Sequence, residues 1–348
     1  ILDGAIAGMV SSLDDPYTIY LPPKQNDDFK QGLAGKFEGI GAELGMKGKD
    51  VIVVAPLDGG PAIKAGIKSG DVILNVNGQS IASLNLSQVA EKIRGPKGTK
   101  VTIAVLHKGG KNASEVKIIR DTIVVKSLTT WSKKIKDIPN INHKDDGISQ
   151  AGDQKIVYIR LSQFGDDTNS EWQKVATAVD RQLNADSNVM GIVLDLRNNP
   201  GGYLNDAVYI SSEFVKDGDA VMQEDKNGKR TSYPVSGKGL LTEAEVVVLL
   251  NKGSASASEI VAGALRDHKR AILLGESSFG KGTIQQAEDL GDGAGLHVTI
   301  AKWLTPDATW VGNGKNGTGL TPDVKVAVDT KNPTHDVQLE KAIGQLLK

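Results

Sequence analysis

Two residues that could act together in catalysis, Ser256 and Lys281, lie in glycine-bounded turns that each follow a short apolar run. Ser256 stands in the segment Asn251–Ile260, and Lys281 stands in the segment Ser278–Gln285. A serine hydroxyl is a poor nucleophile until a neighbouring base accepts its proton. A lysine amine can be that base only where desolvation keeps it neutral near pH 7. The glycines on both sides of Lys281, with Phe279 nearby, favour such a packed amine, so the pair predicts nucleophilic catalysis by a serine and a lysine.

Ser256 also has a purely structural interpretation. Ser256 and Glu259 have the spacing of a capping box, which would stabilise the start of a helix. The two roles are compatible, because backbone N–H groups at a helix start also face negative charge that develops on a substrate. Ser254 and Ser258 are rival nucleophiles that the local pattern does not separate from Ser256.

At these residues the chain resembles the bacterial C-terminal processing peptidases, which are serine–lysine proteases with a PDZ domain. The resemblance rests on the segment Ser254–Ile260, on Phe279-Gly280-Lys281-Gly282, and on the spacing of the two candidate residues (281 − 256 = 25). It extends from Leu13-Asp14-Asp15-Pro16-Tyr17 to Gly319-Leu320-Thr321-Pro322-Asp323. It implies a serine endopeptidase that recognises protein or peptide substrates with apolar C-termini and cleaves upstream of them through an acyl-enzyme.

The resemblance also implies supporting roles for other residues. Gln285 would hydrogen-bond the Lys281 amine and orient it. Gly201 or Gly202, in a segment that reads as strand, turn and helix, would stabilise an oxyanion together with the backbone N–H of Ala257. A tight connection alone would also explain the two glycines, and an exposed polar residue would explain Gln285.

Other mechanisms find less support in the sequence. His268, the histidine nearest to Ser256 in the chain, lies in the segment Arg266–Arg270, which is better explained by cations at a helix C-terminus than by a catalytic triad. No paired-ligand spacing suggests zinc, so we expect no metal or other cofactor. A non-catalytic peptide-binding module of the same fold remains an alternative, but it would not need Ser256, Lys281 and Gln285. A crotonase-like acyl-thioester enzyme is a second alternative, and it would give a PDZ domain nothing to bind.

The pattern of apolar residues predicts a multidomain protein of mixed α/β class, with a β-rich part followed by an α/β core. The resemblance implies that the β-rich part is a PDZ domain and that the α/β core is crotonase-like. In the core, strands and helices alternate, as in a layered parallel sheet. Near the N-terminus apolar residues recur at helical spacing and predict a packed face; the resemblance implies that this region helps to build a dimer or a cap. The expected parts are a helical segment at 1–36, a PDZ domain at 37–125, an exposed linker or insertion at 126–154, a protease core at 155–330 and a C-terminal helix at 331–348.

The predicted PDZ domain carries the expected specificity. The segment Gly70–Gly78 resembles the core of such domains, in which a loop of backbone N–H groups holds a terminal carboxylate while the peptide adds as a strand. The resemblance implies that Arg94 couples peptide binding to the catalytic site, although a simple surface arginine is the alternative. The carboxylate loop would consist of Gly39, Ile40, Gly41 and Ala42, and the pocket for the last side chain of Leu86, Val89 and Ile93, which would also serve the domain core.

Composition sets broad limits on partners and location. The 348 residues carry a formal net charge of −1, which gives no general attraction to nucleic acid or to an anionic membrane. There is no cysteine, so disulfides and thiolate metal sites are excluded. No run of about 18 apolar residues occurs, so we expect no membrane span. The chain begins without methionine inside an apparent helix, which suggests a truncated N-terminus, and the resemblance implies an extracytoplasmic protein.

Overall fold

The computed structural model describes residues 2–47, 50–57, 60–68, 70–82, 84, 86–107, 110, 112–124, 126–144, 146–235, 239–312, 319–329, 332 and 334–348. The chain forms two compact units. One comprises Ile1–Gly35 together with Lys126–Lys348, and the other comprises Lys36–Val125. Both candidate catalytic residues belong to the first unit.

A six-stranded sheet forms the centre of the first unit, in the order β10-β11-β12-β15-β16-β19. β10 runs antiparallel to β11, and the other neighbours are parallel. The strands are β10 (Leu128–Lys134), β11 (Lys155–Leu161), β12 (Val189–Asp195), β15 (Val246–Leu250), β16 (Ala271–Gly275) and β19 (Val324–Lys325).

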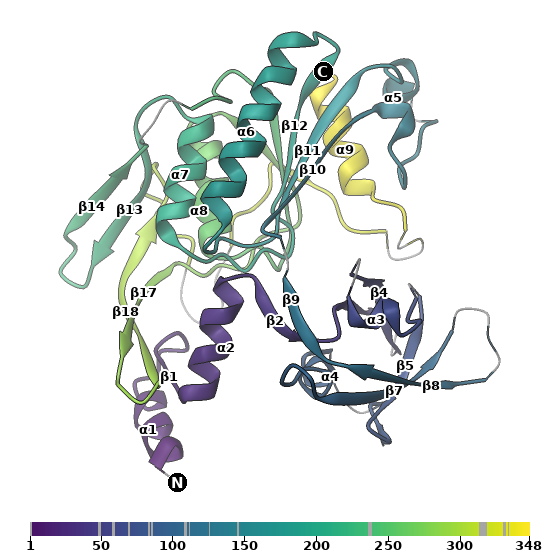
Figure 1. Cartoon of the computed structure of the whole chain (residues 1–348). Coiled ribbons are helices and arrows are strands. Elements are labelled where there is room, and N and C mark those ends of the chain that lie inside the picture. The colour runs from purple at the N-terminus through teal and green to yellow at the C-terminus, as the bar shows by residue number, and fades with distance from the viewer. Residues whose placement is uncertain are drawn as a thin grey trace. The chain divides into compact units, whose positions relative to one another are not determined.

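Helices cover both faces of this sheet (Figure 1). α6, α7 and α8 lie on one face, and α9 and the short helix α5 lie on the other. Alternate residues of each central strand face the two layers, so Val248 packs with the first group and its neighbours Val247 and Leu249 pack with α9. This explains why these strands read as continuous apolar runs. The helices are α5 (Asp146–Gln150), α6 (Thr168–Ala185), α7 (Leu204–Phe214), α8 (Ala257–Asp267) and α9 (Val337–Leu346).

A second, antiparallel sheet ties the N-terminal segment to the core. β18 lies at its centre and pairs with β1, β13 and β17, and β14 pairs with β13. The sequence predicts that the N-terminal segment is helical. The structure differs, because the strand β1 lies between its two helices. The elements are α1 (Leu2–Ser11), β1 (Ile19–Leu21), α2 (Pro23–Leu33), β13 (Asp219–Asp225), β14 (Arg230–Pro234), β17 (Thr283–Asp289) and β18 (Gly295–Leu304).

The expected packed face of the first helix is absent from the described structure. No residue of α1 is buried, and Leu2, Met9 and Leu13 are 74%, 74% and 65% exposed. The apolar spacing in the sequence is real, but in the described part of the chain only Ile6 and Val10 of this face are partly buried.

The segment 126–154 is a further correction, because it is not an exposed linker. β10 pairs along its whole length with β11, and the 3-10 turn η1 (Ile135–Asp137) follows it. Ile135 and Ile138 are 0% and 1% exposed and belong to the core beneath α9. The segment thus adds an edge strand to the sheet, and the isoleucines that follow this strand add part of a core.

The second unit is β-rich with two short helices, as predicted. Its main sheet has the order β3-β4-β5-β7-β8, with β6 beside β5, and β2 pairs separately with β9. One apolar core unites both helices with the strands of the main sheet from β3 to β8, β6 excepted. They are β2 (Lys36–Gly39), β3 (Ala42–Lys47), β4 (Asp50–Pro56), α3 (Pro61–Lys64), β5 (Val72–Val76), β6 (Gln79–Ser80), α4 (Leu86–Ile93), β7 (Lys100–Leu106), β8 (Ser114–Ile119) and β9 (Asp121–Val124).

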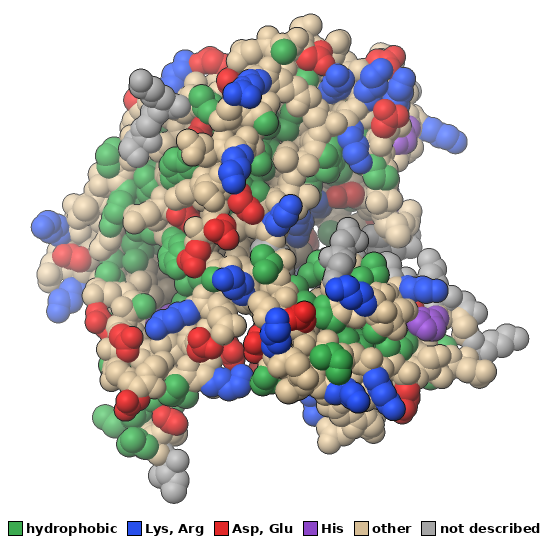
Figure 2. Space-filling model, in the orientation of Figure 1, with side chains coloured by type: hydrophobic (Ala, Val, Ile, Leu, Met, Phe, Trp, Pro, Cys, Tyr) green, Lys and Arg blue, Asp and Glu red, His purple; other side chains and the backbone are tan. Residues whose placement is uncertain are grey.

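The surface is mixed in charge. On the face shown in Figure 2, basic and acidic side chains are interspersed, in keeping with the net charge of −1. Among the described residues, no helix has both the length and the apolar character needed to cross a bilayer.

Candidate active site

Ser256 lies between β15 and α8, immediately before the first residue of the helix. Its backbone angles, φ 55° and ψ −116°, fall in a region that residues with a side chain rarely adopt. Such a conformation costs about 1–3 kcal/mol and persists only where the surroundings enforce it, which is common at active sites. The Ser256 residue remains partly exposed.

The hydroxyls of the two rival serines donate structural hydrogen bonds to the backbone. Ser254 and Ser258 are both 0% exposed. The Ser254 hydroxyl donates to the carbonyl oxygen of Leu196 at 2.8 Å, and the Ser258 hydroxyl donates to that of Asn199 at 2.9 Å. Among the three serines, Ser256 is thus the one that a substrate can reach.

Glu259 connects the turn that holds Ser256 to the turn that holds Lys281. Its Oε2 accepts the backbone N–H of Ser256 at 2.8 Å and that of Lys281 at 3.0 Å. Its Oε1 accepts the hydroxyl of Ser278 at 2.5 Å and the N–H of Gly280 at 2.7 Å. The capping box predicted from the sequence is therefore present, and the same carboxylate holds the second turn. Glu259 is 0% exposed, and this burial raises its pKa against the opposing effect of the four hydrogen bonds.

Lys281 lies in the turn between β16 and β17, and its amine is largely shielded from water. Burial lowers the pKa of Lys281, and the charge of Glu259 partly opposes this shift. The aromatic ring beside the amine is that of Tyr17, whose centroid lies 5.5 Å from Nζ. Phe279, the aromatic residue singled out in the sequence, is 53% exposed. Sequence reasoning therefore missed the shielding residue, although Tyr17 stands in a motif that carries the family resemblance.

Gln285 lies on β17, close in sequence to Lys281, but its amide nitrogen binds two threonines. Nε2 donates to the hydroxyls of Thr283 at 2.8 Å and Thr299 at 3.3 Å. Its Oε1 accepts no hydrogen bond within the described part of the chain. The bonds to the threonines fix the orientation of the amide and leave the oxygen available.

The glycine turn after β12 lies directly against Ser256. Gly201 has a φ of 95°, and a Cβ there would lie 2.8 Å from the Ser256 Cβ and 2.9 Å from the Ala257 nitrogen. At Gly202 a Cβ would lie 1.7 Å from the carbonyl oxygen of Phe164. Only glycine fits at either position, so the close approach of the two turns explains the glycine pair.

Asn199, a residue that sequence reasoning did not single out, holds the glycine turn in place. Its Nδ2 donates to the carbonyl oxygen of Leu161 at 2.9 Å, and its Oδ1 accepts the N–H of Gly201 at 2.9 Å. The N–H groups of Ala257 and Gly202 make no hydrogen bond within the described residues. These two groups are therefore free to donate to a ligand.

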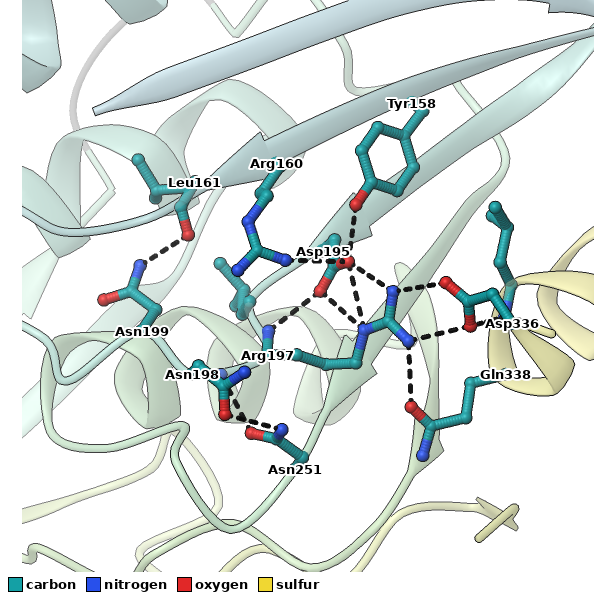
Figure 3. Close-up of polar contacts among 12 residues, drawn as sticks. Tyr158, Arg160, Leu161, Asp195, Arg197, Asn198, Asn199, Asn251, Asp336 and Gln338 are labelled. Atoms are coloured by element: carbon teal, nitrogen blue, oxygen red, sulfur yellow. Dashed lines mark hydrogen bonds and ion pairs between the residues drawn. The ribbon is translucent and has the colours of Figure 1, made fainter. Parts of the chain in front are cut away.

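A buried ionic network anchors the other end of the same turn (Figure 3). Arg197 donates to both carboxylate oxygens of Asp195 and to both of Asp336, at 2.6 to 3.0 Å. Tyr158 donates to Asp195 at 2.6 Å, and Gln338 accepts from Arg197 at 3.0 Å. Asp336 is also the N-cap of α9. The network thus links the C-terminal helix to the residues just before the glycine turn.

The charges of this network reinforce one another. Although burial alone would lower the pKa of Arg197, the carboxylates of Asp195 and Asp336 raise it. Burial likewise opposes ionisation of Asp336, but the hydrogen bonds and charge of Arg197 lower its pKa. Arg197 therefore stays a cation that holds two carboxylates together.

His268 lies at the opposite end of α8 from Ser256. The eleven-residue helix separates them by about 16 Å at 1.5 Å per residue. A ring nitrogen of His268 lies 2.8 Å from the carbonyl oxygen of Asp219. This geometry rules out His268 as the base for Ser256.

In the second unit, several residues predicted to bind a peptide form part of the apolar core. Ile40, Val89 and Ile93 are 4%, 0% and 4% exposed and belong to one cluster. The side chain of Leu86 lies outside the described residues. The core role that the sequence allows for the pocket residues is therefore present for Val89 and Ile93, and Ile40, predicted only for the carboxylate loop, is also part of the core.

The predicted carboxylate loop and Arg94 lie next to each other within the second unit. Gly41 has a φ of 69°, and a Cβ there would lie 2.9 Å from Ile123. A Cβ on Gly39 would lie 3.9 Å from Arg94, whose guanidinium carbon is 5.2 Å from the centroid of the Phe37 ring. Ala42 begins β3 directly after this loop.

The comparisons with known proteins agree with this architecture. Peptidase family S41 matches residues 155–326, and a PDZ domain matches residues 52–106. The carboxy-terminal processing protease CtpA of Bacillus subtilis (strain 168) is 36% identical over 326 residues, which are 93% of this chain and 64% of CtpA. CtpB of the same organism is 35% identical over 330 residues, 94% of this chain and 63% of CtpB. The chain thus spans less than two thirds of the length of these relatives.

A solved structure extends the similarity to the fold. The photosystem II D1 C-terminal processing protease is 33% identical, with a TM-score of 0.61, over 95% of this chain and 84% of that one. The fold class and the PDZ domain predicted from the sequence are confirmed. The chain therefore belongs to peptidase family S41, among the C-terminal processing proteases that carry a PDZ domain.

Proposed function

We propose that this protein is a serine endopeptidase in which Ser256 is the nucleophile and Lys281 is the general base. The observation that carries the proposal is the single buried carboxylate of Glu259, which accepts N–H groups from both residues. It holds a partly exposed serine and a shielded amine in two adjoining turns. Burial lowers the pKa of Lys281, as a base that must be neutral requires.

The reaction would proceed in two halves. The neutral Lys281 amine accepts the Ser256 proton while the serine oxygen attacks the scissile carbonyl carbon, and the ammonium then gives that proton to the leaving amine. The C-terminal product leaves, and an acyl-enzyme remains. In the second half the amine takes a proton from water, the resulting hydroxide attacks the ester, and the proton returns to the serine oxygen.

The backbone around Ser256 would stabilise the tetrahedral intermediates. The N–H groups of Ala257 and Gly202 are the proposed donors to the oxyanion. Gly201 serves by its lack of a side chain, since its own N–H donates to Asn199 at 2.9 Å. The free Oε1 of Gln285 would accept a hydrogen bond from the Lys281 amine and orient it.

The PDZ domain would select substrates by their free C-termini. The N–H groups of the loop Gly39–Ala42 would hold the terminal carboxylate, and the apolar residues of α4 would receive the last side chain. Arg94, beside Gly39, would couple this binding to catalysis. The proposed substrates are unfolded proteins or peptides with apolar tails, in an extracytoplasmic setting. The exposed apolar side chains of α1 suit a homodimer contact.

A cleavage assay on an unfolded protein with an apolar tail tests the proposal. Wild-type protein should release fragments, whereas Ser256→Ala and Lys281→Ala should not, with unchanged circular dichroism. Lys281→Arg should also fail, because a guanidinium stays protonated. Near-normal turnover of either alanine variant would contradict the proposed mechanism.

A further inference from the structure

Tyr17 reaches the catalytic base from a part of the chain that is remote in sequence. Its ring centroid lies 5.5 Å from Lys281 Nζ, and Tyr17 itself is partly buried. The proposed mechanism assigns this ring no role. It nevertheless lies beside the atom whose protonation state would decide activity.

A built turn holds Tyr17 in this position. The Asp15 carboxylate accepts the Tyr17 backbone N–H at 3.1 Å and the Thr18 hydroxyl at 2.5 Å. The Thr18 hydroxyl in turn accepts the N–H of Thr299 on β18 at 3.1 Å. Although partial burial raises the pKa of Asp15, these hydrogen bonds lower it overall, so the carboxylate stays ionised and the turn stays locked.

The same strand position also orients Gln285. Thr299 donates its N–H to the turn that carries Tyr17, and its hydroxyl accepts from Gln285 Nε2 at 3.3 Å. Thr299 of β18 therefore helps to hold the Tyr17 turn in place and also helps to orient Gln285.

We propose that Tyr17 is a positioning residue of the active site, whose ring covers the Lys281 amine and limits its contact with water. This inference rests on the proposed function. The segment before β1 would then act on catalysis through the environment of Lys281.

The ring has two opposite effects on the Lys281 amine. The larger of the two decides whether the ring raises or lowers the Lys281 pKa. A cation–π contact stabilises the protonated form, whereas exclusion of water destabilises it. Burial is the main cause of the lowered Lys281 pKa. Because the ring lies 5.5 Å from the amine Nζ, we take exclusion of water as the larger of its two effects. The other ionisable groups near the amine are Glu259, whose charge raises the Lys281 pKa, and His297 of β18, whose own pKa is lowered by burial and by Lys281. Removal of the ring should therefore raise the Lys281 pKa.

The test is the pH dependence of kcat/KM for a fluorogenic peptide with an apolar free C-terminus. Tyr17→Ala should move the midpoint of the acid limb to higher pH. Well below the midpoint, the rate should fall about tenfold for every pH unit by which the midpoint moves. Tyr17→Phe should keep the wild-type midpoint, since it retains the ring. Partial unfolding of a variant would lower the plateau without moving the midpoint, so the readout separates positioning from folding.

Tyr20→Ala is the matched control, because it removes a neighbouring tyrosine whose hydroxyl binds the exposed Asp3. It should leave the midpoint unchanged. A Tyr17→Ala midpoint equal to wild type, or lower, would contradict the role of Tyr17 alone, provided that wild-type protein is active and Ser256→Ala is not. Absence of Ser256-dependent turnover in the wild type would instead contradict the proposed function, and with it this inference.

Discussion

One carboxylate oxygen of Glu259 accepts the backbone N–H of Lys281 at 3.0 Å while it also accepts that of Ser256 at 2.8 Å. Both turns are thereby fixed to the first turn of α8. Because all four acceptor positions of the carboxylate are occupied, a change at Glu259 would disturb the two turns together.

Glu259→Gln should lower kcat about 100-fold, because an amide nitrogen cannot accept the N–H groups and the two turns would shift. It also removes a negative charge that raises the Lys281 pKa. The acid limb of the pH profile should therefore move to lower pH, the opposite of the change expected for Tyr17→Ala. Steady-state kinetics over a pH series, with the melting temperature as control, would check both effects. An unchanged midpoint in a folded variant would contradict the electrostatic part of this account.

Asp336→Ala should lower the free energy of unfolding by about 2 kcal/mol, because it leaves the largely buried Arg197 guanidinium without one of its two carboxylate partners. Asp336→Asn is the matched control, since asparagine keeps the N-cap of α9 that Asp336 provides to Leu339. Urea denaturation of both variants would separate the ion pair from the cap. Wild-type stability of Asp336→Ala would show that α9 does not depend on this network.

Asp206 on α7 should give the protein an unusual pH dependence of stability. Its Oδ2 is buried and has no partner among the described residues, and burial raises its pKa from 3.8 to about 6. The folded state thus binds the proton more tightly than the unfolded state, so ionisation destabilises the fold as the pH rises from 3.8 to about 6.

Asp206→Asn should therefore raise the melting temperature at about pH 7.5, and the gain should vanish towards about pH 4. Asp217→Asn, at an exposed carboxylate, is the control and should have little effect. A gain that is the same at both pH values would exclude the ionisation of Asp206 as its cause.

The PDZ domain should respond to the charge of the substrate tail. Amidation of the C-terminus removes the carboxylate that the loop Gly39–Ala42 would hold. The loss of these charge-assisted hydrogen bonds should raise KM about tenfold. Paired free-acid and amidated peptides measure this directly. Substitution of Ile40 is a poor test, because Ile40 is 4% exposed and belongs to the domain core. Equal cleavage rates for the two peptides would show that the domain does not recognise the terminal carboxylate and acts at most as a tether.

Local features of the sequence predict well the structure around Ser256 and Lys281. The apolar runs before Ser256 and Lys281 became the parallel strands β15 and β16, and the capping box at Glu259 is present. Each of these signals lies within about ten residues of the position it describes. Periodicity and turn chemistry therefore suffice to identify them.

Contacts between distant segments could not be predicted in the same way. The ring of Tyr17 reaches Lys281 only because β1 pairs with β18, and Arg197 meets Asp336 only because α9 packs under the sheet. The buried Ile135 and Ile138 stand in polar sequence, which reads as a linker. In each case tertiary packing decides the outcome, and the sequence carries no local signal for it.

Covalent labelling with a fluorophosphonate serine probe tests the central claim most directly, because it reports the activated nucleophile without a choice of substrate. Intact-mass analysis of wild-type protein should show one adduct, and peptide mapping should place it on Ser256. Ser256→Ala should show none, and Lys281→Ala should react far more slowly while its circular dichroism stays unchanged. An adduct on another serine, or equal labelling rates for wild-type and Lys281→Ala protein, would contradict a Ser256–Lys281 dyad.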